Sequence, residues 1–165
     1  MFKKLNLRVN KPFYMNLFSN PNRIPESYGL RIAAGLIAYF LLMKVLGLGH
    51  HVELRLLNLF IIVSGIYFAL KKFKETHGKH LNYFLALATG VATGAIASLV
   101  FALFLFIWMK LDANMMQSII DNDPMGRYLN AYMAAFIVAL EGVFSGLLVT
   151  FILINYINTD EVGGA

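Results

Sequence analysis

A single acidic residue, Glu141, interrupts the long apolar stretch that runs over residues 128–157. At ~1.5 Å per residue it lies about 20 Å along a helix from Tyr128, close to the middle of a bilayer. A carboxyl group at that depth is energetically unfavourable, and such residues usually face other helices and mark a functional site. The alternative is a protonated side chain that is hydrogen-bonded within a helix bundle. The residue type is compatible with both interpretations.

Glu141 belongs to a polar stripe on one side of this predicted helix. With 100° of rotation per residue, the stripe consists of Asn130, Glu141, Ser145 and Asn155. Small residues, among them Gly142 and Gly146, occupy a different side of the same helix. The pattern predicts a packing face and a separate polar seam, which would line a solute path, a proton site or a protein interface. Lys44 lies inside another predicted span, so it either pairs with Glu141 or extends towards the membrane surface.

Residues suited to catalysis or to metal binding are few. The chain has no cysteine, and its histidines occur as two pairs in two different loops, His50 with His51 and His77 with His80. Those loops are predicted on opposite membrane faces, so no four-ligand site can draw on both. No nucleophile motif or phosphate-binding loop is present. We therefore expect no catalytic, cofactor-binding or metal site, and no enzyme activity.

The third hydrophobic stretch, residues 81–109, carries no charge and is long enough to cross a bilayer. Small residues recur within it at strict four-residue spacing: Ala86, Gly90, Gly94, Ser98 and Ala102. Such a stripe allows two helix backbones to approach closely, which holds helices together where lipid supplies no hydrophobic driving force. The ladder predicts a helix-packing seam, and the sequence leaves open whether it closes within one chain or between chains.

Composition places these segments in an integral membrane protein. Of the 165 residues, 59% are hydrophobic and only 14% are charged, against about 25% in average soluble proteins. Four spans are predicted, over residues 30–48, 54–70, 81–109 and 128–157, within a membrane domain over residues 29–157. Residues 1–28 are a predicted N-terminal arm and residues 158–165 a short tail. Between the last two spans, Asp112 is suited to cap a short amphipathic helix.

Basic residues are unevenly distributed between the loops and termini. Ten lysines and arginines fall within residues 1–31 and 71–80, which predicts that both termini are cytoplasmic. The most clustered are Lys3, Lys4, Arg8, Lys11, Lys71, Lys72 and Lys74. They are expected to contact anionic lipid headgroups. The basic arm either lies on the membrane or docks on a partner, or it only follows the positive-inside rule. No soluble basic surface is large enough to bind nucleic acid.

The segment GIYFALKKFKETHGKHLNYFLALATGVATGAIASLVFALF, residues 65–104, carries a family resemblance. It resembles the small four-span bacterial membrane proteins grouped as domain of unknown function 4199, and the likeness extends over residues 30–157. The resemblance implies an all-α, four-helix membrane bundle in the bacterial cytoplasmic membrane, and it implies no site residues. The basic arm is not a feature that this family leads us to expect.

Strong packing surfaces and scarce reactive chemistry favour a non-enzymatic accessory or scaffold subunit. It would pack through its small-residue helix faces in a larger membrane complex or in a homo-oligomer. The alternative is a small oligomeric transporter or channel component that uses Glu141. A lipid-modifying enzyme is a third class, for which a nucleophile or metal set is missing from the sequence.

Overall fold

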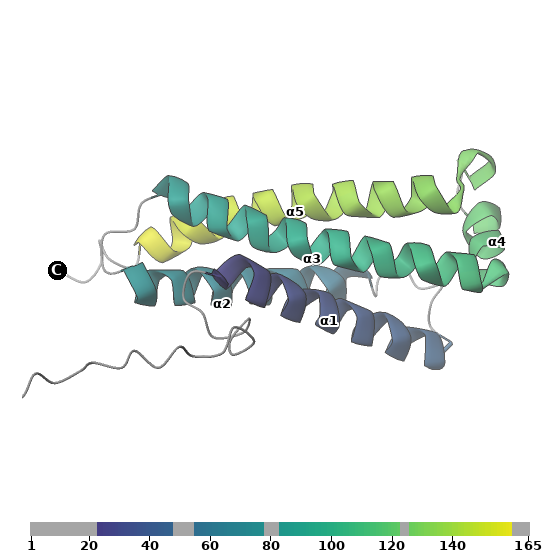
Figure 1. Ribbon diagram of the computed structural model, residues 1–165, viewed down its shortest axis with the longest axis horizontal. Helices are drawn as coiled ribbons and strands as arrows, with labels where there is room; N and C mark the ends of the chain where they lie inside the picture. Colours follow the sequence, from purple (N-terminus) through teal and green to yellow (C-terminus); the bar gives the residue numbers. More distant parts are fainter. Residues whose placement is uncertain (1–22, 48–54, 78–82, 123–125, 160–165) are drawn as a thin grey trace, which may run out of the picture.

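The computed structural model describes residues 23–47, 55–77, 83–122 and 126–159, and every regular element in these ranges is a helix. Four helices are long, and they run alongside one another in Figure 1. They are α1 (Ile24–Val45), α2 (Arg55–His77), α3 (Tyr83–Leu111) and α5 (Ala131–Thr159). The short helix α4 (Ala113–Asn122) and the 3-10 turn η3 (Gly126–Tyr128) lie at one end of the long helices.

Local sequence signals account for where the helices begin and end. Pro25 and Glu26 occupy the first turn of α1, where proline needs no hydrogen-bond acceptor and a carboxylate faces the positive end of the helix dipole. The same helix ends at Val45, and Gly47, two residues further on, has a φ of 70° and donates its amide to the Lys44 carbonyl. Asp112 follows α3, and its carboxylate accepts the Met115 amide at 3.4 Å, so it caps α4 as the sequence predicted.

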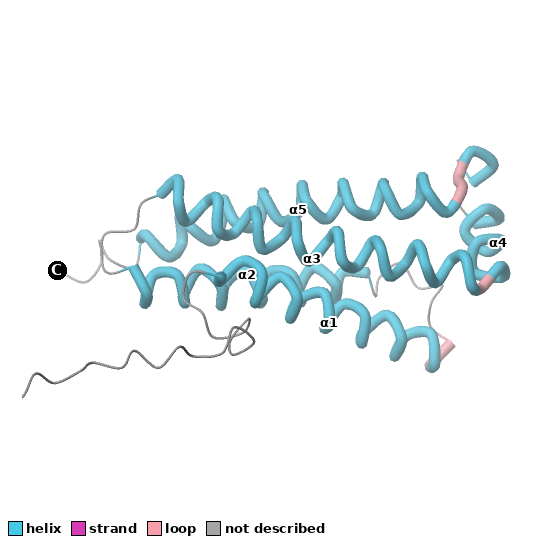
Figure 2. Tube along the Cα trace, viewed as in Figure 1, coloured by secondary structure: helices cyan, strands magenta, loops and turns pink. Residues whose placement is uncertain are grey.

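Helix α3 is the centre of the molecule, since it contacts α1, α2, α4 and α5. Its most extensive contact is with α5, and α5 also packs against α2. Figure 2 shows α3 running the length of the molecule beside α5. In the most apolar part of α3, 44% of the residues are buried, against 17% in α5. Much of the α5 surface is therefore left uncovered by the described parts of the chain.

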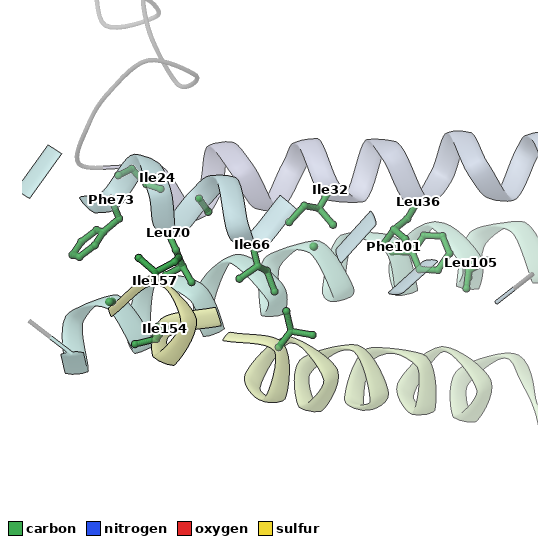
Figure 3. Close-up of a cluster of buried hydrophobic side chains, with 14 of the residues drawn as sticks. Ile24, Ile32, Leu36, Ile66, Leu70, Phe73, Phe101, Leu105, Ile154 and Ile157 are labelled. Atoms are coloured by element: carbon green, nitrogen blue, oxygen red, sulfur yellow. The ribbon is translucent and has the colours of Figure 1, made fainter. Parts of the chain in front are cut away.

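The hydrophobic core lies where α1, α2, α3 and α5 meet. Figure 3 shows Ile66 and Leu70 of α2 beside Ile154 and Ile157 of α5, and Leu36 of α1 near Phe101 of α3. Ile66, Leu70 and Ile154 are at most 1% exposed. The basic end of α2 is also tied to α5, because Lys74 donates a hydrogen bond to the Ile157 carbonyl at 3.4 Å. That bond satisfies a carbonyl at the negative end of the α5 dipole.

Three helices in the described residues are long and apolar enough to span a membrane: α1, α3 and residues 131–157 of α5. The four spans that the sequence predicts are not confirmed. Helix α2 has a comparable length, but its apolar part ends at Leu70 and the helix continues through Lys71, Lys72 and Lys74. Helix α2, which carries these charges, is not among the three candidate spans found in the described residues. The molecule is thus a multi-pass membrane protein with at least three candidate spans.

Several helices extend beyond the predicted spans. Helix α1 begins at Ile24, within the segment that was assigned to the N-terminal arm, because Pro25 starts a helix here instead of breaking one. Helix α2 continues to His77. Lys3, Lys4, Arg8 and Lys11 lie outside the described residues, as do His50, His51, His80 and the end of the C-terminal tail.

Candidate functional site

The small-residue ladder of α3 and the glycines of α5 face each other within one chain. All five ladder residues are buried. A β-carbon added to Gly94 would lie 3.0 Å from the Gly146 Cα atom, and one added to Gly146 would lie 3.1 Å from the Gly94 Cα atom. Gly90 is opposite Thr150, and Gly142 is opposite Ser98. We call this contact the glycine seam; it brings the α3 and α5 backbones together and buries Gly90, Gly94 and Gly146.

Hydroxyl groups along the glycine seam bond within their own helices. Thr93 donates to the Thr89 carbonyl at 2.7 Å, Ser98 to the Gly94 carbonyl at 2.8 Å, and Thr150 to the Gly146 carbonyl at 2.6 Å. A carbonyl four residues earlier is the usual acceptor for a hydroxyl inside a helix. These groups therefore fill the seam as small, internally satisfied side chains.

Glu141 points away from the glycine seam and is exposed at mid-length of α5. The residues around it are exposed as well, and they recur at spacings of three and four. We call this surface the Glu141 face; it consists of Ile137, Glu141, Phe144, Leu148, Phe151 and Asn155. Helix α5 thus has the two separate faces that the sequence predicts, with Glu141 on the outside of the molecule.

Two other members of the polar stripe, Asn130 and Asn155, form hydrogen bonds with backbone groups of α5. The Asn130 side-chain carbonyl accepts the Met133 amide at 2.9 Å and so caps the start of α5. Asn155 donates to the Phe151 carbonyl at 2.9 Å. Ser145 is half-buried one turn after Glu141. The two asparagines are therefore bonded to backbone groups of α5, and the stripe lies on the partly exposed surface around Glu141.

Lys44 pairs with Asp112 and not with Glu141. The Lys44 ammonium forms a salt bridge with the Asp112 carboxylate and lies 4.7 Å from the Trp108 ring centroid. The hydrogen bond from Lys44, together with its charge, holds the pKa of Asp112 below its ordinary value. This contact joins the end of α1 to the α3–α4 junction. Sequence reasoning identified Asp112 only as a cap, because no local signal reveals a partner that is distant in the chain.

The basic residues at the end of α2 have different environments. Lys71 is exposed, Lys72 is bonded to Glu75 at 3.2 Å, and Lys74 is half-buried and reaches the end of α5. Lys71 and Lys72 are placed to meet solvent or headgroups, whereas Lys74 holds two helices together. One further cation, Arg31, lies inside α1, and the sequence reasoning did not single it out.

No His, Asp and Glu group of three or more in the described part of the chain is arranged to hold a metal ion. A search of curated proteins and a search of solved structures each returned no match. The profile of a family described as "Protein of unknown function (DUF4199)" matches residues 27–123, which is more than half of the chain. The matched segment includes most of α1 and all of α2, α3 and α4, and therefore the whole α3 ladder. This membrane protein belongs to the DUF4199 family.

Proposed function

We propose that the chain is a non-enzymatic accessory or scaffold subunit of the bacterial cytoplasmic membrane. It assembles with copies of itself or with a larger membrane complex through the Glu141 face. The observation that carries this proposal is the exposure of Glu141 about 15 Å from the start of a helix that is long and apolar enough to cross the membrane.

The energetic argument concerns an acid in contact with lipid. A charged side chain at the centre of a membrane helix costs about 2.5–3.5 kcal/mol on insertion scales. A polar group on a neighbouring helix would offset that cost by hydrogen bonding to the Glu141 carboxyl group, with about 1 kcal/mol expected from such a bond. The described residues of the chain leave the Glu141 face uncovered, so a second protein helix is the natural source of this contact.

The form of the surface also supports assembly. The members of the Glu141 face follow one another at spacings of four, three, four, three and four residues, which is the repeat of helices that pack side by side. The sequence analysis expected a partner to pack on the small-residue faces. In the structure these faces form the glycine seam, in which α3 and α5 of the same chain pack against each other. A partner would therefore use a different surface, and among the described residues the Glu141 face combines helix-packing spacing with an intramembrane acid.

The experiment measures the native mass of the full chain in mild detergent and identifies any protein that accompanies it. Because the chain has no cysteine, single cysteines can also report contacts by oxidative cross-linking. Leu148→Cys lies on the Glu141 face, and Leu99→Cys on α3 is its matched control, because the two leucines are 60% and 58% exposed. We expect a larger assembly that is lost in Glu141→Leu and partly kept in Glu141→Gln, whose amide still forms hydrogen bonds.

In a homo-oligomer, Leu148→Cys is expected to cross-link and Leu99→Cys is not. In a mixed complex, a defined protein co-purifies with the wild type and is lost in Glu141→Leu. A lone monomer without any associated protein contradicts the proposal. An assembly that is unchanged in Glu141→Leu contradicts the assignment of the Glu141 face as the interface.

A second candidate function is transport by an oligomer, and the ionisable character of Glu141 favours it. Since Glu141 faces outward, a pathway that uses it would form between chains. In that case Glu141→Gln should abolish a proton- or cation-coupled flux in proteoliposomes while the oligomer persists. Equal flux from the wild type and Glu141→Gln would contradict this function and leave the assembly proposal intact.

A further inference from the structure

A groove of about 380 Å³ lies between α1 and α2, away from the Glu141 face. Its lining residues are Tyr28, Arg31, Ile32, Ile61, Gly65 and Phe68. This volume lies within the range of roughly 300–1,000 Å³ that is usual for small-ligand sites. The lining is apolar apart from the Tyr28 hydroxyl and the Arg31 guanidinium, so the groove offers a hydrocarbon surface with a cation at its edge.

The floor of the groove exists because Gly65 has no side chain. A β-carbon at Gly65 would overlap the Ile32 side chain, so this glycine lets α1 and α2 approach there. Phe68, one turn further along α2, is 55% exposed and forms a wall. Figure 3 shows Ile32 directed from α1 into the interior. The outcome is an open groove with a mainly apolar lining between the two helices.

Arg31 is positioned near the membrane surface although it belongs to a candidate span. It lies about 10 Å along α1 from Ile24, and its guanidinium carbon is 5.0 Å from the centroid of the Tyr28 ring, one turn nearer the start of the helix. Arginine side chains near helix ends extend in this way towards the interface. The Arg31 charge is therefore close to the depth at which lipid phosphates lie.

The charges near this end of the groove are predominantly positive. Helix α2 contributes exposed Lys71 and Lys72 just beyond Phe68, with Glu75 bonded to Lys72. Helix α1 contributes Arg31 and the half-buried Glu26. Lysines near the membrane surface attract anionic lipid by about 1 kcal/mol each, and a guanidinium matches the geometry of a phosphate better than an ammonium does.

We propose that the α1–α2 groove binds an anionic glycerophospholipid, with the lipid phosphate on Arg31 and one acyl chain along Ile32, Ile61 and Phe68. Lys71 and Lys72 add long-range attraction for the headgroup. This site is independent of the assembly proposed for the Glu141 face, because the two surfaces belong to different helices.

The test is native mass spectrometry of the full chain released from nanodiscs that contain phosphatidylglycerol and phosphatidylcholine. We expect a phosphatidylglycerol adduct on the wild type that falls at least several-fold in Arg31→Gln and is partly kept in Arg31→Lys. Lys110→Gln, which removes an exposed cation at the other end of the molecule, should keep the adduct. Phe68→Ala should weaken it, whereas Phe60→Ala, an exposed phenylalanine on α2 outside the groove, should not.

Unchanged circular dichroism and melting of Arg31→Gln in detergent establish that the variant folds. With that control in place, an adduct equal to that of the wild type overturns the proposal, as does equal retention of phosphatidylcholine and phosphatidylglycerol. An increase of the adduct on deletion of residues 1–22 would assign the groove to that segment of the chain. A dimer that is lost in Phe68→Ala would assign it to a second copy, and both of these results contradict a resident lipid.

Discussion

The contact between α3 and α5 depends on single missing side chains. At Gly142 an added β-carbon would overlap the Ser98 side chain, whose own Cα atom is 3.6 Å from that position. Ser98 is 5% exposed and bonded to the Gly94 carbonyl, so it cannot move aside without loss of packing and of a hydrogen bond. The addition of one carbon atom at Gly142 is therefore enough to disturb its packing against Ser98.

Gly142→Ala should destabilise the fold by about 1–3 kcal/mol, the usual range for overpacking a well-filled interior. Ser98→Gly in the same chain should recover part of that loss, since it removes the atoms that the new methyl group meets. The measurement is unfolding in mixed micelles followed by circular dichroism. Additive effects of the two substitutions would show that they do not share a contact and would contradict the seam geometry.

Asp112 gives the protein a response to acid. The hydrogen bond from Lys44 lowers the pKa of Asp112 below 3.8, the value expected for an unperturbed side chain. Its contribution to stability is therefore complete above about pH 3.8 and is lost as the pH falls through the lower pKa of the folded state. Neutral and mildly acidic conditions leave the contact between Lys44 and Asp112 intact.

Fluorescence of Trp108, the single tryptophan, reports this contact because the Lys44 ammonium lies 4.7 Å from its ring centroid. We expect the emission to change with a midpoint below pH 3.8. The transition should be absent in Asp112→Asn and present in Asp121→Asn, which alters an acid on α4 that bonds to Gln117. A wild-type transition that persists in Asp112→Asn would show that another group titrates.

At the scale of the elements, helix ends are set by side chains that satisfy free backbone groups. Asp112 ends α3 and starts α4, so it supports two helices at one turn of the chain. Asn130 starts α5 by accepting the Met133 amide. Both residues lie at the end of the molecule that carries α4, where the connection between α3 and α5 depends on these two caps.

Asn130→Ala should cost about 1 kcal/mol by removal of the α5 cap, and Asn130→Asp should cost little because aspartate caps equally well. Hydrogen exchange of the first-turn amides in residues 131–134 is the measurement, and these amides should exchange faster only in the alanine variant. Asn155→Ala is the matched control, since Asn155 is an asparagine inside the same helix. Equal exchange in Asn130→Ala and the wild type would contradict the capping role.

At the scale of the whole molecule, the cations divide between the two ends. Arg23, Lys71, Lys72 and Lys74 lie at the end where α1 begins and α2 ends, and Lys110 lies at the opposite end. Lys44 also lies at that opposite end, where it is paired with Asp112. The positive-inside rule thus predicts that the end with Lys71 faces the cytoplasm.

Cysteine labelling of intact cells tests this orientation. Because the chain has no native cysteine, only the introduced cysteine of each variant can react. Lys110→Cys should react with a membrane-impermeant maleimide added outside. Lys71→Cys should react only after the cells are permeabilised. Both positions are exposed, so the difference depends on membrane sidedness. The reverse pattern would mean that the charge count misassigned the orientation.

Much of this architecture could be predicted because it rests on local signals. Apolar stretches, a four-residue ladder and single caps such as Asp112 depend on neighbours in the chain, and the all-helical membrane fold follows from them. The predicted number of spans is not confirmed, and α2 combines an apolar stretch with a basic end. Helix boundaries also differ from the prediction: α1 begins at Ile24, within the predicted arm, because Pro25 is suited to a first turn.

The order of residues is enough to predict a helical membrane protein with a small-residue stripe, an acid within a predicted span and basic segments. Which surfaces meet became visible in the folded molecule. It closed the glycine seam between α3 and α5 of one chain, paired Lys44 with Asp112, and placed Glu141 on the outside and Arg31 beside an apolar groove. The physical reason is that a helical periodicity defines the faces of each helix, whereas partners far apart in sequence are selected by the joint packing of all helices.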